Sequence, residues 1–313
     1  MPRKLELEAL EAELAAVAAL LDEAKTLSDP VGVVQYQQRR QELEQEIEGL
    51  RDGEVHPASV ALYFGGKPVL GSRGIAADFA GKALEHFQEI ISKQFATDEL
   101  GALGERGRIP LKPLTSLMVT GVTQGSFGFL LDELDEQTQM FDTALKQVVS
   151  ESMAVIESAG SADENAFEQA AEALDGRTLA ALKDFFVHLD ATEATLRLVD
   201  DKRDLSLDRD AVHRARVRTE ATKIDEEDKD VTGVLLGFLP KERRFELQLP
   251  SGETICGTAT KEATEQYVHT MEGGKPAVWK QCSAKVKERT VKPIDRAPRL
   301  VYRLLEFSAL GQE

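Results

Sequence analysis

Two stretches near the N-terminus carry apolar residues at alternating three- and four-residue spacing, which is the repeat of a coiled-coil seam. The seam positions are Leu7, Leu10, Leu14, Val17 and Leu21 in the first stretch, and Tyr36, Arg40, Leu43, Ile47 and Leu50 in the second. Asp29 and Pro30 stand between the stretches as a helix cap followed by proline at the first helical position. The pattern predicts a coiled-coil arm of two helices in residues 1–53, which either fold back as a hairpin or run on with a kink.

Each seam is only about three heptads long, and helices of this length are marginal when isolated. They need each other, a second chain or the body of the protein. Two alternatives therefore stand. Either the seam mediates self-association, with a dimer favoured, or an antiparallel hairpin packs on its own chain.

The bulk numbers describe an ordinary soluble globular chain. The composition is 42% hydrophobic and 30% charged. The length of 313 residues is enough for two or three domains. No apolar run approaches the ~18 residues of a membrane span, and the first residues lack the apolar core of a signal peptide. Only Cys256 and Cys282 occur, so no disulfide framework is implied. We expect a cytoplasmic protein with no membrane association and two free thiols.

The charge is unevenly distributed along the chain. The net charge is −17, but residues 231–313 carry +3 and the rest carries −20. The net negative charge argues against nucleic-acid binding by the whole surface. The C-terminal part differs from the rest because its net charge is positive. We predict three domains: the helical arm at 1–53, a central domain at 54–224 and a small β-barrel at 230–313, with 224–233 as a charged linker.

The central region mixes predicted hairpins and helices without a βαβ rhythm, which favours the α+β class. Strands joined by tight turns are expected at 58–64 with 69–72, at 116–122 with 127–134, and at 194–200 with 205–208. Helices are expected at 75–96, 135–159, 163–174, 178–189 and 209–223, with Thr178 as an N-cap. Gly128 is expected to let two strands approach closely.

Five predicted strands and one helix make up the C-terminal module. The strands are 231–240, 243–250, 253–260, 277–290 and 299–307, and the helix is 261–271, between the third and fourth strands. This order resembles that of an OB-fold barrel, and an SH3-like barrel is the alternative. The resemblance rests on element order over about 80 residues and includes no sequence motif. It implies a five-stranded barrel that acts as a binding module.

Common catalytic patterns are incomplete in this chain. Ser126 lies in Gly-Ser-Phe-Gly, which is not a nucleophile elbow, and none of the five histidines stands in a recognisable setting. Zinc-type ligand spacing is absent, so no metal and no cofactor are predicted. An acidic cluster could hold a metal, but Asp132 or Asp135 as a cap of the next helix explains it without one, and this structural reading is favoured: Asp132, Glu133, Asp135 and Glu136.

Two further sets of residues are candidate binding sites. The turn Gly71, Ser72, Arg73 and Gly74 precedes a long helix, where backbone amides can meet an anion. Lys285, Lys287 and Arg289 alternate on one strand face. With nearby residues they form a basic, aromatic surface of the kind that single-strand binders use: Trp279, Lys292, Arg299 and Tyr302. The alternative is a solvated edge strand guarded by lysines.

The pattern as a whole favours a non-enzymatic cytoplasmic interaction or scaffold protein. It would self-associate through the helical arm and bind a protein partner through the C-terminal barrel. One alternative is nucleic-acid binding by the basic face of the barrel. A second alternative is an enzyme with an unfamiliar site near the 132–136 acidic cluster.

Overall fold

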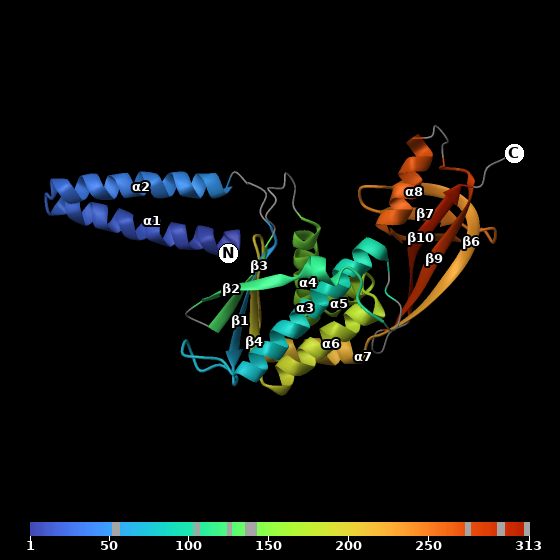
Figure 1. Ribbon diagram of the computed structural model, residues 1–313, viewed down its shortest axis with the longest axis horizontal. Coiled ribbons are helices and arrows are strands. Elements are labelled where there is room, and N and C mark those ends of the chain that lie inside the picture. Colours follow the sequence, from blue (N-terminus) through green and yellow to red (C-terminus); the bar gives the residue numbers. More distant parts are fainter. Residues whose placement is uncertain are drawn as a thin grey trace. The chain divides into compact units, whose positions relative to one another are not determined.

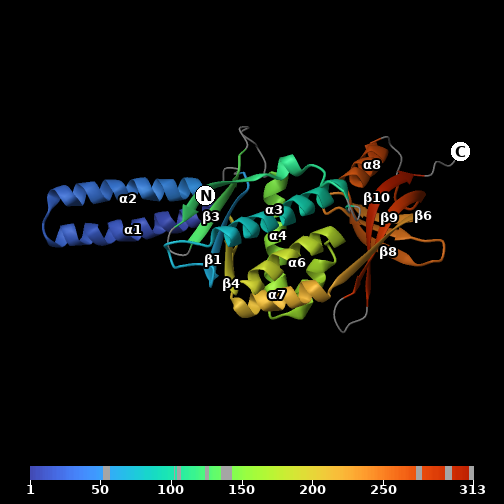
Figure 2. The same ribbon diagram turned by 60° about the horizontal axis from the view of Figure 1, so that its bottom comes forward.

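The computed structural model describes residues 1–51, 57–101, 103, 107–123, 127–134, 143–272, 277–292 and 298–309. Within them the chain is a mixed α+β protein with eight α-helices and two sheets, one a closed five-stranded barrel (Figures 1 and 2). It divides into two compact units. Unit 1 holds 1–75, 117–151 and 195–207, and unit 2 holds 76–116, 152–194 and 208–313. No helix in the described part of the chain is long and apolar enough to cross a membrane.

The arm in unit 1 consists of helices α1 (Arg3–Thr26) and α2 (Pro30–Arg51), which lie antiparallel (Figure 1). The carboxylate of Asp29 accepts a hydrogen bond from the amide of Val31, so the predicted helix start is confirmed. Ion pairs join the two helices: Arg39 Nη2 lies 2.8 Å from Glu13 Oε1, and Arg51 Nη2 lies 2.7 Å from Glu11 Oε1. These ion pairs join the two helices of one hairpin within the chain.

The base of the arm is anchored on the sheet of unit 1. The amide of Arg3 donates to Asp201 Oδ1 at 2.8 Å. Leu5 packs against an apolar cluster of Ala61, Tyr63 and Val199 from the sheet. The first turn of α1 is therefore part of the core of this unit.

The sheet of unit 1 has the strand order β2-β3-β1-β4-β5. Its strands are β1 (Ser59–Gly66), β2 (Leu117–Thr123), β3 (Phe127–Glu133), β4 (Ala194–Val199) and β5 (Asp204–Leu207). The β2–β3 and β4–β5 hairpins are confirmed. The predicted strand at 69–72 is wrong, because the loop after β1 closes on itself through Leu70 N–H to Gly74 O and a single bridge between Val69 and Ile75. Strand β1 pairs instead with β3.

Gly128 of β3 leaves room for the ring of Tyr63 on β1. It stands opposite Tyr63 in the antiparallel register. A Cβ atom at this position would overlap the Tyr63 ring. The Tyr63 ring thus packs over Gly128, while close approach of the two strands themselves stays a prediction.

The helical part of unit 2 is built on α3 (Ala77–Leu100) and α6 (Gly176–Ala191), which pack together. The predicted apolar stripe of α3 is buried, including Phe79, Phe87 and Phe95. The remaining helices before the barrel are α4 (Ala144–Gly160), which begins in unit 1, α5 (Glu164–Ala171) and α7 (Arg209–Ala221), and the short turn η1 spans Lys112–Thr115. Thr178 is not the cap of α6: Asp175 is, and its carboxylate accepts from the amide of Thr178 at 2.6 Å.

The barrel of unit 2 is closed by five strands in the order β10-β8-β7-β6-β9. They are β6 (Lys223–Leu239), β7 (Arg244–Gln248), β8 (Thr254–Ala259), β9 (Gln281–Lys292) and β10 (Arg299–Ala309), with helix α8 (Lys261–Glu272) between β8 and β9. The β8–β10 pair is parallel, and the other pairs in the barrel are antiparallel. Tyr267 of α8 stacks on Phe238 with ring centroids 4.3 Å apart, so the helix covers one end of the apolar core.

The charged linker predicted at 224–233 is wrong. These residues form the first half of β6, which pairs with β9 from Lys223 opposite Lys292 to Val234 opposite Gln281. The acidic residues look like a solvated linker in the sequence because no apolar alternation marks them. In the structure they are stabilised by the basic strand beside them.

Candidate functional site

The basic strand β9 lies in register with the acidic strand β6. Lys285 stands opposite Asp230, Lys287 opposite Asp228, and Arg289 opposite Glu226. Opposite charges at facing positions stabilise an antiparallel pair. The basic residues that suggested nucleic-acid binding and the acids that suggested a linker are therefore one complementary set.

The distances show how closely each basic side chain of β9 approaches a carboxylate. Lys287 Nζ lies 3.0 Å from Asp228 Oδ1, and Arg289 Nε lies 3.1 Å from Glu226 Oε1. Lys292 Nζ lies 2.5 Å from Asp225 Oδ2, whereas Lys285 Nζ is 4.0 Å from Glu306 Oε1. Each of the four lysines and arginines of β9 thus has a carboxylate within ion-pair distance.

Two basic side chains of the barrel are buried inside unit 2. Arg289 is 2% exposed and donates through Nη1 to the carbonyl of Leu174 at 3.1 Å. Arg303 of β10 donates through Nη2 to the carbonyl of Thr97 at 2.8 Å. Burial and the neighbouring Arg289 lower the pKa of Arg303 to about 10. Burial also raises the pKa of Glu226, more than its attraction to Arg289 lowers it.

Asp175 is the residue that organises this buried region, and sequence reasoning missed it. Besides capping α6, its carboxylate accepts from Thr97 Oγ1 at 2.7 Å and from the amide of Leu103 at 3.1 Å. Burial raises the pKa of Asp175, but these hydrogen bonds outweigh it and the net shift is downward. The only sequence signal was an aspartate three residues before Thr178, which fits a cap as well as Thr178 does.

The remaining residues of the predicted basic and aromatic surface lie in different environments. Arg299 Nη1 lies 2.9 Å from Glu172 Oε1, and Arg299 Nη2 lies 3.3 Å from Glu168 Oε2. Tyr302 is half-buried and packs against the barrel core. Trp279 is 74% exposed, and its backbone is held in the left-handed region with φ 64°. Among the predicted surface residues, Trp279 is the one presented to solvent as a large apolar group.

The predicted seam residues of the arm pack within the hairpin. Val17, Leu21, Leu43 and Ile47 are buried. The other apolar members of the set are half-buried: Leu7, Leu10, Leu14, Tyr36 and Leu50. The seam is thus occupied by the chain's own second helix, as the hairpin alternative required.

A different part of the arm carries exposed apolar side chains. Leu20, Leu27, Val31 and Val34 are between 43% and 71% exposed and flank the turn between α1 and α2; we call them the apolar tip. Along α1, the outward face opposite the seam continues toward the sheet as exposed small residues: Ala9, Ala12, Ala16 and Ala19. Exposed apolar side chains on both sides of this turn make the end of the arm a candidate contact surface.

In the turn at Gly71, Ser72, Arg73 and Gly74, one backbone amide is already hydrogen-bonded within the loop. The amide of Arg73 donates to the carbonyl of Leu70 at 3.0 Å, and Gly71 adopts φ 54°. Helix α3 begins three residues beyond Gly74, at Ala77. The structure places the four residues in an exposed or half-exposed turn.

The described members of the acidic cluster have structural partners. Asp132 accepts from the hydroxyls of Ser59 and Thr120, and its Oδ1 lies 3.5 Å from the N-terminal amine. Glu133 accepts from the amide of Ala58 at 2.8 Å and from the Thr143 hydroxyl at 2.7 Å. Burial raises the pKa of Asp132, but the two hydroxyl bonds lead to a net lowering. Asp135, Glu136 and Ser126 lie outside the described residues.

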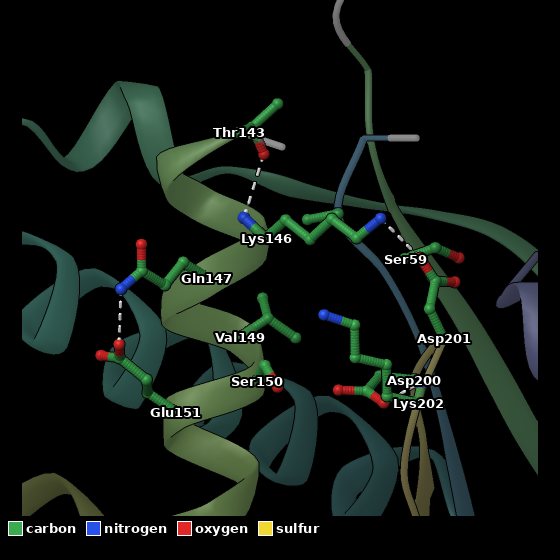
Figure 3. Close-up of a pocket in the computed structure, with 11 residues that line it drawn as sticks. Ser59, Thr143, Lys146, Gln147, Val149, Ser150, Glu151, Asp200, Asp201 and Lys202 are labelled. Atoms are coloured by element: carbon green, nitrogen blue, oxygen red, sulfur yellow. Dashed lines mark hydrogen bonds and ion pairs between the residues drawn. The ribbon is translucent and has the colours of Figure 1, made fainter. Parts of the chain in front are cut away.

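A cavity of about 300 Å³ lies in unit 1 between α4 and the β4–β5 turn (Figure 3). Lys146 of α4 and Lys202 of the turn extend into it from opposite sides, and Lys146 Nζ lies 2.7 Å from Asp201 Oδ2. Asp200 is buried and accepts from the amides of Lys202 and Arg203, so it shapes the turn. The lining residues contain no histidine, and two lining hydroxyls, those of Ser59 and Thr143, donate to Asp132 and Glu133. This cavity is large enough for a small polar molecule.

Further reactive side chains among the described residues include a histidine that packs and hydrogen-bonds within the fold and two free cysteines. His188 stacks on Phe79 at 5.0 Å and its Nε2 lies 3.1 Å from the Phe79 carbonyl oxygen. The two cysteines are free, as predicted; burial raises the pKa of the Cys282 thiol to about 11, and Cys256 is exposed. Within the ranges that the structure describes, no group of three His, Cys, Asp or Glu side chains is placed to hold a metal.

Comparisons with family models, curated proteins and solved structures found no match. Three structural features bear on function. They are a hairpin arm with an apolar tip, a barrel whose basic strand is neutralised, and an exposed tryptophan beside that strand.

Proposed function

We propose that this chain is a non-catalytic interaction protein that forms a dimer through its helical arm. The observation that carries the proposal is the apolar tip, whose four side chains lie in water although the seam of the same hairpin is closed. Burying them requires a second molecule.

A second copy of the chain suits this surface. A two-helix hairpin supplies half of a four-helix bundle, which is a stable way to bury short helices. Alanines at three- and four-residue spacing on the outer face of α1 allow another helix to approach closely. A two-fold contact also needs only one kind of surface, and two-fold dimers are the commonest homo-oligomers.

Light scattering on full-length variants tests the arm. Replacing Leu27, Val31 and Val34 together by lysine should convert a dimer to a monomer, because three charges would be buried in an apolar contact. A matched variant replaces three exposed glutamines of α2, Gln37, Gln41 and Gln45, by lysine and should remain a dimer. Equal masses for the two variants would contradict a role for the apolar tip.

We propose further that the barrel is an OB-like module that binds a protein partner through Trp279. The OB-like assignment is supported by the strand order, the parallel β8–β10 pair and the position of α8. Trp279 is exposed, and its backbone is held in place because its amide donates to the Leu235 carbonyl at 2.7 Å. Exposed tryptophans are frequent energetic anchors of interfaces. The neutralised basic strand favours a protein partner over nucleic acid.

A photo-reactive amino acid placed at Trp279 tests this contact in cells. A discrete cross-linked product should form at position 279 and be absent when the same group is placed at the exposed Lys241 of the barrel. Cross-linking that is identical at both positions, or absent at both, would remove the case for Trp279.

A further inference from the structure

A second cleft, in unit 2, has the opposite charge from the molecule as a whole. It is lined by Lys93 of α3, Arg108 and Lys112 of the following loop, and Arg177 of α6; we call these four residues the basic cleft. Glu89 is the one acid of the lining. The lining therefore has a formal charge of +3, although the chain carries −17 and the residues outside the cleft carry −20.

Two of the four cations have solvent-facing charges. Lys93 Nζ is paired with Glu89 Oε2 at 3.0 Å and is largely buried. Arg108 and Lys112 are exposed, and neither forms an ion pair with another described residue. Both side chains therefore face solvent with no carboxylate of the described residues within ion-pair distance, whereas each β9 base has one.

The loop that carries Arg108 and Lys112 is fixed at both ends. Arg177 Nη2 donates to the carbonyl of Gly107 at 2.9 Å, which ties the start of the loop to α6. At the other end, Thr115 is buried and its hydroxyl lies 2.7 Å from that of Ser92 on α3, while Gln88 donates to the Thr115 carbonyl at 2.7 Å. A site held in this way loses little conformational entropy when a ligand binds.

The size and chemistry of the cleft define the ligand class. The volume is about 560 Å³, which is in the range of sites for small molecules. Arginine and lysine side chains converging on one space match phosphate oxygens, and Ile109 and Pro113 add an apolar wall. An extended polyanion would meet the acidic remainder of the chain, so a compact ligand is favoured.

We propose that the basic cleft binds a small phosphorylated molecule with two or more adjacent phosphate groups. Arg108 and Lys112 contact the phosphates, Arg177 both shapes the loop and adds positive charge, and the apolar wall contacts the organic part. This site is independent of the arm and of Trp279.

Titration calorimetry of the full chain with inorganic triphosphate at low salt tests the site. Wild type should bind, and Arg108→Gln with Lys112→Gln should weaken the affinity at least tenfold, since two charge-assisted contacts are lost. A matched double variant, Lys261→Gln with Lys292→Gln, removes the same charge from exposed positions of unit 2 and should change the affinity less than twofold. Thermal unfolding of each variant checks that the fold is retained.

Three results would overturn the proposal. One is the absence of binding heat from wild type at millimolar triphosphate. Another is an equal loss of affinity in both double variants, which would reflect net charge alone. The third is tighter binding of a single-stranded oligonucleotide than of triphosphate through Arg108 and Lys112, which would assign the cleft to a polymer.

Discussion

Single residues in this chain often have roles that their local sequence does not reveal. Asp175 reads as an ordinary loop acid, yet it holds α6, Thr97 and Leu103 together. Asp132 and Glu133 read as acids preceding a helix, with a metal site as the alternative, yet their carboxylates accept hydrogen bonds from hydroxyl and amide groups of other segments. These partners are far away in sequence, so only the fold could identify them.

His188 should make stability depend on pH. Burial lowers its pKa, as do His86 and Lys82, while the Phe79 carbonyl and Asp78 raise it. With a folded pKa below the unfolded value of about 6.5, its contribution is present above that value and is lost as pH falls through the folded pKa. Urea unfolding at pH 7 and pH 5 should therefore show a larger loss for wild type than for His188→Gln. The same loss in both proteins would show that His188 is not the titrating group.

Gly257 should be intolerant of a side chain. A Cβ at this position would overlap the carbonyl oxygen of Tyr302, which stands opposite it in the parallel β8–β10 pair. Gly257→Ala should lower the free energy of unfolding by about 3 kcal/mol, because a backbone atom must move. Gly237→Ala is the control, since its Cβ would meet nothing within 4 Å, and should change stability by less than about 0.5 kcal/mol. Chemical denaturation compares the two, and similar values would contradict the barrel packing.

At the scale of elements, the helix stripe and hairpin predictions that held rest on apolar periodicity, whereas the linker prediction, which rests on charge, failed. The stripe of α3 and the β2–β3 hairpin were visible as apolar patterns. The first half of β6 was not, because its stabilising partner is β9, more than 50 residues later. The sequence did contain a signal for this half of β6: an acidic run and a basic run that could pair in antiparallel register. That signal can be used only if the two strands are already known to be neighbours.

The β6–β9 charge ladder should be strongest at its buried pair, Arg289 with Glu226. Glu226→Gln leaves Arg289 without its facing carboxylate and should cost about 3 kcal/mol of unfolding free energy. Asp230→Asn removes a charge opposite the half-exposed Lys285 and should cost less than about 1 kcal/mol. Urea unfolding at neutral pH measures both. An equal cost at the two positions would mean that burial does not determine the strength of the ladder.

At the scale of the whole molecule, the arrangement of charge and apolar surface separates three roles. The basic strand of the barrel is neutralised by its neighbour, the basic cleft keeps its charge, and the apolar tip keeps its exposure. The coiled-coil spacing predicted the hairpin as one of two alternatives, but it could not show which face would remain free after the seam closed.

The most direct test of the central claim is the mass of the wild-type chain by sedimentation equilibrium across a wide concentration range. The monomer mass is 34.4 kDa. Dimerisation through the arm predicts a mass twice this value, and dissociation to the monomer only on dilution. A mass of 34.4 kDa at every concentration would contradict self-association.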